Sequence, residues 1–145
     1  MIYYLIASIL IAVAALFART KRAVLAAGIL FYAVQIAAAG LLLWGGLYDT
    51  TSAAFFTFDA LGTLFYLLLV VVSMYVFGHS EAYLQGEDLR SYRLYFALLM
   101  LLTTAIAGAY FANNLAVTWI FLEATTLCSA GIIYHRRTAQ ALEAA

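Results

Sequence analysis

Residues 115–134, LAVTWIFLEATTLCSAGIIY, decide how the whole chain is interpreted. As an α-helix this stretch would be about 30 Å long, which is enough to cross the hydrocarbon layer of a membrane. Glu123 is the one charged residue in it and lies near its middle. Holding a charged side chain at that depth costs at least ~2.5–3.5 kcal/mol. We therefore expect Glu123 to face protein or water and to have a functional role.

The composition of the chain predicts a membrane protein. Of its 145 residues 68% are hydrophobic and 10% are charged, and the mean hydropathy is +1.03. A soluble domain could not bury so much apolar surface, and the apolar runs are continuous rather than alternating, which favours helices over a β-barrel. We expect an all-α, polytopic membrane protein with about five transmembrane helices. The net charge of zero gives no indication of a nucleic-acid partner.

Five apolar runs indicate the helices of a single transmembrane region that covers residues 1–145. We expect these helices at about residues 2–18, 23–48, 60–77, 94–111 and 115–134. Asp59 precedes the third run, where its carboxylate can cap a helix by accepting hydrogen bonds from free main-chain amides. The polar segment 79–93 is expected to be a solvated loop, because His79 and Glu81 have no third metal ligand close by.

The basic residues predict the orientation. All seven fall in the first loop, the third loop or the C-terminal tail, which five spans place on one side: Arg19, Lys21, Arg22, Arg90, Arg93, Arg136 and Arg137. Segments rich in Lys and Arg stay on the cytoplasmic side of a membrane. We therefore expect a multi-pass protein of the inner (plasma) membrane, with the N-terminus outside and the C-terminal tail in the cytoplasm.

One face of the fifth expected helix surrounds Glu123. Residues at three- and four-residue spacing share that face, namely Ala116, Trp119, Ile120, Thr126, Leu127 and Ala130. The small side chains would let a neighbouring helix approach, and Thr126 could offer a hydroxyl. We expect this face to lie against protein. Because none of the five runs contains Lys or Arg, a cationic partner for Glu123 must come from another chain or from a segment that this sequence lacks.

Few other polar residues lie within the apolar runs. Gln35, in the second run, could form a hydrogen bond between helices or line a water path. The single Cys128 cannot form an internal disulfide, and no set of metal ligands accompanies it. The sequence has no Cys cluster for an iron–sulfur centre and no glycine-rich dinucleotide loop. We therefore expect no metal, no cofactor and no catalytic centre in this chain.

Two segments of the sequence resemble a known family. FFTFDALGTLFYLLLVVVSMYVFGH (55–79) and AYFANNLAVTWIFLEATTLCSAGIIYHRRTAQALEAA (109–145) are similar to the first third of the antiporter-like proton-pumping subunits. Such subunits occur in respiratory complex I, in multisubunit sodium/proton antiporters and in energy-converting hydrogenases. WIFLEATTL (119–127), followed by basic residues and ALEAA (141–145), most resembles the hydrogenase-4 branch of that family.

The resemblance implies a role for Glu123. In that family a glutamate on the fifth transmembrane helix pairs with a lysine on the seventh, and the pair belongs to a proton path across the membrane centre. Glu123 stands at the matching position. Because full members continue into further helices, we expect this chain to be the N-terminal part of a longer subunit. The implied partners are protons, the lipid bilayer and other membrane subunits of a respiratory or hydrogenase complex, including one that supplies a Lys or Arg near Glu123.

Two functions follow from these expectations. The first is a membrane module of a proton-translocating subunit, in an oxidoreductase complex whose redox chemistry belongs to other chains. In this case Glu123 takes up and releases a proton, with Thr126 and Gln35 as possible supporting polar residues. The alternative is a structural or assembly subunit, in which Glu123 only ties two helices together.

Overall fold

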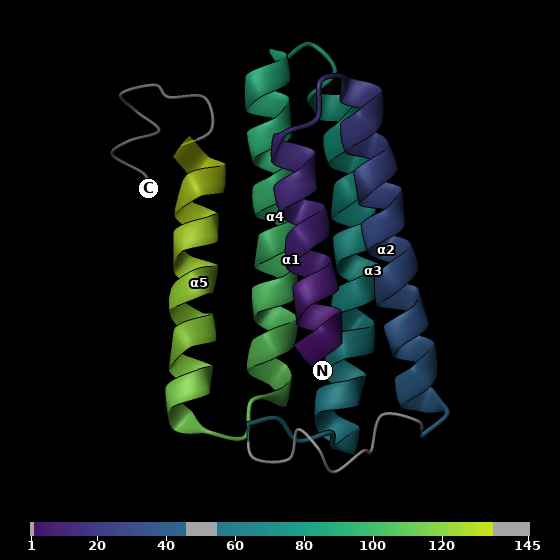
Figure 1. Cartoon of the computed structure of the whole chain (residues 1–145), viewed down its shortest axis with the longest axis vertical. Helices are drawn as coiled ribbons and strands as arrows, with labels where there is room; N and C mark the ends of the chain where they lie inside the picture. Colours follow the sequence, from purple (N-terminus) through teal and green to yellow (C-terminus); the bar gives the residue numbers. More distant parts are fainter. Residues whose placement is uncertain (1, 46–54, 135–145) are drawn as a thin grey trace.

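The computed structural model describes residues 2–45 and 55–134 of the chain. These residues form the helices α1 (Ile2–Leu16), α2 (Lys21–Leu43), α3 (Ala60–Tyr83), α4 (Leu89–Phe111) and α5 (Leu115–Ile133). Successive helices run in alternating directions (Figure 1). The helices α2, α3, α4 and α5 are long and apolar enough to cross a membrane, whereas α1 is a shorter apolar helix. The expected all-α, polytopic membrane fold is confirmed.

The prediction of a loop over the whole of residues 79–93 is wrong. α3 continues to Tyr83 and α4 begins at Leu89, so that His79 and Glu81 lie in the last turns of α3. Leu84, directly after α3, is fully buried. The helices continue because hydropathy marks the apolar layer of the membrane, whereas helical hydrogen bonding can extend beyond that layer.

The second helix also differs from its expected bounds of 23–48. α2 begins earlier, at Lys21, because the Thr20 hydroxyl caps it by accepting a hydrogen bond from the Ala23 amide at 3.2 Å. It ends at Leu43, and Gly45 then adopts a positive φ of 75° that glycine tolerates best. Residues 46–48 lie outside the described part of the chain.

Capping side chains stand at the starts of α3 and α5. The Asp59 carboxylate accepts a hydrogen bond from the Gly62 amide at 2.9 Å, as expected for a helix cap. Asn114 caps α5 in the same way, through a hydrogen bond from the Ala116 amide at 2.8 Å. These caps fix the residue at which each helix begins, and hence which way its side chains face.

α4 is the central helix of the bundle. It packs against each of the other four helices, and Figure 1 shows it between α5 and the group formed by α1, α2 and α3. Its buried side chains include the small residues Ala97, Ala105 and Ala107, which let neighbouring helices come close. The buried hydroxyls of Thr103 and Thr104 donate to main-chain carbonyls of α4 itself.

A short antiparallel contact ties the segment before α3 to the turn between α4 and α5. The Thr57 amide donates to the Phe111 carbonyl, and the Asn113 amide donates to the Phe55 carbonyl, both at 2.8 Å. This pair of hydrogen bonds fixes the position of the turn from which α5 begins.

Gln35 holds α1, α2 and α3 together. Its side chain is completely buried. The hydroxyls of Tyr4 and Tyr66 donate to its Oε1 atom at 2.5 and 2.8 Å, and its Nε2 atom donates to the Ser8 hydroxyl at 3.5 Å. Of the two roles expected for Gln35, the hydrogen bond between helices is the one that these contacts show.

Replacing Gln35 with Leu should destabilise the bundle, because the Tyr4 hydroxyl then loses its acceptor inside an apolar environment. A buried donor left without a partner costs about 1–3 kcal/mol. Gln35→Leu/Tyr4→Phe should recover part of that loss. Gln35→Leu/Tyr66→Phe should recover less, because the Tyr66 hydroxyl keeps the Gln35 main-chain carbonyl as an acceptor at 3.2 Å.

The measurement is unfolding of the purified chain in mixed detergent micelles, followed by circular dichroism. Gln85→Leu, at an exposed glutamine beyond the end of α3, is the matched control and should leave the midpoint nearly unchanged. A Gln35→Leu variant as stable as the wild type would show that this network does not hold the three helices together.

Candidate functional site

Glu123 lies in the middle of α5 and is exposed. No residue of α5 is buried. On the face of Glu123, Trp119 is 63% exposed and Leu127 is 71% exposed. Within residues 2–45 and 55–134 no helix covers this face, although we expected it to lie against protein. The described part of the chain therefore presents an acidic side chain on an uncovered, otherwise apolar helix surface.

The packing of α5 on α4 determines where Glu123 points. Phe121 lies against Gly108 of α4, where even a single added carbon would collide with its ring. Further along, a carbon added at Gly131 would lie 2.8 Å from Leu98 of α4. Successive residues of a helix are about 100° apart, so Glu123, two residues after Phe121, points nearly opposite to it. The two glycines bring α5 close to α4 and thereby turn Glu123 away from the bundle.

Phe121 also anchors the first half of α5. Its ring lies 6.1 Å from that of Phe56, measured between centroids, and both pack into the cluster around buried Tyr66 and Phe111. This aromatic cluster joins the segment before α3 to α3, α4 and α5. It leaves the Glu123 side of α5 free.

The hydroxyl groups on α5 are satisfied within the helix. Thr126 donates to the main-chain carbonyl of Glu123 at 2.8 Å, not to its carboxylate. Thr125 and Ser129 likewise donate to carbonyls three residues earlier, at 2.7 and 2.9 Å. A hydroxyl that has used its proton can still accept one, so Thr126 remains a possible acceptor for a protonated Glu123 carboxyl.

The structure does not bring the predicted site residues together as one group. Thr126 lies one turn from Glu123, but Gln35 belongs to the buried network of α1, α2 and α3, on the other side of α4 from α5. Among the described residues no three metal-ligating side chains lie close enough to hold an ion. A carboxylate with one neighbouring hydroxyl can exchange a proton or bind a cationic side chain.

Sequence reasoning missed two features. The first is the pair Tyr4 and Tyr66 as partners of Gln35. The available signal was the presence of hydroxyl-bearing residues in the first and third apolar runs. The second lies at the basic end of the bundle. There the Lys21 ammonium donates to the Gln85 carbonyl at 2.7 Å, and the Arg93 guanidinium donates to the Ala18 carbonyl at 3.0 Å.

These contacts bear on the expected topology. They place the α1–α2 connection beside the α3–α4 connection, at the same end of the bundle as the C-terminal end of α5 (Figure 1). The expectation that the first and third loops share one side is therefore confirmed. Arg136 and Arg137, expected on the same side, lie outside the described residues.

Comparison with protein families, curated proteins and solved structures finds no match to this chain. The likeness to antiporter-like subunits accordingly stays an expectation from the quoted segments. The structure shows a bundle of apolar helices of the multi-pass type, in which no described residue covers the face of α5 that carries the Glu123 carboxylate.

Proposed function

We propose that this chain is a membrane module of a proton-translocating, antiporter-like subunit in a redox-driven complex of the hydrogenase or respiratory type. In this proposal Glu123 is the carboxylate that takes up and releases a proton. The other subunits carry the redox chemistry. Protons and neighbouring membrane subunits are the partners of the module.

The position of Glu123 is the observation that carries the proposal. Gln35 and the hydroxyls of Thr103 and Thr104 have hydrogen-bond partners within the chain. Glu123, by contrast, is exposed at the middle of an apolar helix. A charge at that depth is costly and is characteristic of ion pathways and proton relays. The cost is avoided if another subunit, or a further segment, covers this face with a cationic or hydrogen-bonding group.

A specific observation favours the alternative, a structural or assembly subunit. A proton path needs consecutive hydrogen-bonding groups, and the hydroxyls next to Glu123 donate to the backbone of α5. The buried network around Gln35 lies on the other side of α4. If no partner completes a path, Glu123 serves only to tie α5 to another helix.

The proposal includes an orientation in the inner membrane, with the basic end of the bundle in the cytoplasm. Single cysteines introduced at Thr57 and at Gln85, in a Cys128→Ser background, should distinguish the two ends. Both positions are exposed. A membrane-impermeant maleimide should label Thr57→Cys in intact cells and Gln85→Cys only after the cells are permeabilised. Labelling in the reverse order would mean that the orientation is inverted.

Glu123→Gln should reduce proton translocation at least about tenfold, because it keeps the shape and hydrogen-bonding capacity of the side chain but removes its titratable group. Glu123→Asp should keep part of the activity, since the carboxylate survives on a shorter side chain. The measurement is proton uptake into membrane vesicles that contain the assembled complex, driven by the electron donor of that complex. Co-purified subunits are quantified from the same membranes.

Glu81→Gln is the matched control for this experiment. Glu81 lies at the end of α3, within hydrogen-bonding range of Gln85 at 3.5 Å, and its replacement should leave translocation unchanged. Full translocation by Glu123→Gln would refute the proton role. Loss of the partner subunits, with translocation falling in proportion, would instead establish the tie between helices.

A further inference from the structure

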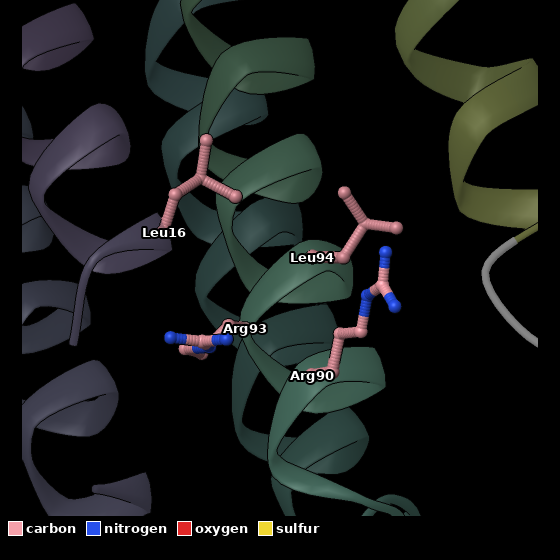
Figure 2. A pocket seen from close by; sticks show the side chains of 4 residues that line it. All are labelled: Leu16, Arg90, Arg93 and Leu94. Atoms are coloured by element: carbon pink, nitrogen blue, oxygen red, sulfur yellow. The ribbon is translucent and has the colours of Figure 1, made fainter. Parts of the chain in front are cut away.

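A cleft of about 220 Å³ opens at the end of the bundle where α4 begins. Figure 2 shows its lining side chains, Leu16 at the end of α1 and Arg90, Arg93 and Leu94 in the first two turns of α4. Two arginines and two leucines therefore line one concave surface. Among the residues that the structure describes, no acidic side chain lines the cleft.

Arg93 is held in place and still has donors to offer. Its Nη1 atom donates to the Ala18 carbonyl at 3.0 Å, which fixes the guanidinium between α4 and the end of α1. Its Nε atom is buried and has no hydrogen-bond partner. Buried polar atoms in proteins are almost always paired, so this unpaired donor is unusual for a charged side chain.

Arg90 supplies a second positive charge on the same surface. Its side chain is exposed and extends beside Leu94 (Figure 2), and no carboxylate among the described residues pairs with it. Glu87 and Asp88 precede it at the start of α4 but do not line the cleft. The two guanidinium groups point to opposite sides of α4 (Figure 2) and so flank the cleft. Each of them can donate to an oxygen atom of an anion that lies between them.

The cleft lies where apolar helix surface gives way to charge. Leu16 ends α1 shortly before Arg19, and the apolar part of α4 starts at Leu94. Five basic residues stand at this end of the described structure against three acidic ones: Arg19, Lys21, Arg22, Arg90 and Arg93 against Glu81, Glu87 and Asp88. Phospholipid phosphates occupy this level of a membrane, and basic pockets between transmembrane helices bind anionic headgroups.

We infer that the cleft between α1 and α4 binds the phosphate group of an anionic phospholipid. Arg93 donates to the phosphate oxygens from one side of the cleft, and Arg90 donates from the other. Leu16 and Leu94 contact the glycerol and the first acyl carbons. The leucines distinguish this ligand from a free phosphate ion, which would gain nothing from an apolar wall.

The experiment is native mass spectrometry of the full chain, released from detergent, during titration with phosphatidylglycerol, phosphatidylcholine or inorganic phosphate. The wild type should retain phosphatidylglycerol at least about tenfold more tightly than phosphatidylcholine, and inorganic phosphate should not displace it. Arg90→Gln and Arg93→Gln should each weaken phosphatidylglycerol binding by about tenfold, as expected for the loss of one charge-assisted contact. Arg93→Lys should give an intermediate loss, because it keeps the charge but not the planar fork.

Arg22→Gln is the matched control, since it removes one exposed basic charge from the same end without touching the cleft. Its binding should stay within twofold of the wild type. Arg90→Gln keeps the test valid if Arg93→Gln fails to fold, because the Arg90 side chain is exposed. Equal weakening by Arg22→Gln, unchanged binding by Arg90→Gln, or displacement by inorganic phosphate would each overturn the inference.

Discussion

The absence of water from the interior of a bilayer is the constraint on which this structure depends. Polar groups placed there must find partners within protein, because lipid offers none. Gln35 meets the constraint through tyrosine and serine hydroxyls on two neighbouring helices. The threonines of α4 and α5 meet it through their own helix backbones. Glu123 does not meet it within the described chain, which is why it dominates the functional interpretation.

The packing of α4 explains why Glu123 in particular is left exposed. Because α4 packs against all four other helices, it is enclosed, whereas α5 contacts the rest of the bundle mainly through α4. Gly108 and Gly131 bring the two helices so close that one side of α5 is occupied and the other is open. The exposure of Glu123 is therefore a result of how small residues are distributed between two helices. It does not require any special conformation of Glu123 itself.

Much of the fold could be predicted from the sequence, because apolar runs and helix caps are local signals. Asp59 stands at the residue where α3 begins, as its side-chain chemistry requires. The bounds that sequence reasoning placed wrongly, at the end of α3 and the start of α4, lie in polar helix beyond the apolar layer. There the relevant signal is a contact between helices, such as that between the hydroxyls of Ser80 and Tyr95 at 2.8 Å, and hydropathy does not detect it.

The candidate site was only partly predictable, for a similar reason. The depth of Glu123 follows from its place in one helix, and the nearness of Thr126 follows from helical spacing. Which side of α5 is covered depends on Phe121 meeting Gly108, a contact between helices that periodicity alone does not fix. The same holds for Gln35: its polarity within an apolar run is visible in the sequence, but its partners Tyr4 and Tyr66 are set by the packing of three helices.

The antiparallel contact between Phe56 and Ala112 has a consequence for how the protein is made. The turn after Tyr83 joins α3 and α4 at one end of this helical hairpin, and the contact between Phe56 and Ala112 joins them at the other end. Since α3 leaves the ribosome before α4, the contact cannot form until both helices have been synthesised and inserted. α5 starts only a few residues beyond it. The contact that sets the direction of α5 therefore depends on residues from both sides of the preceding hairpin, and it can form only after α4 has been synthesised.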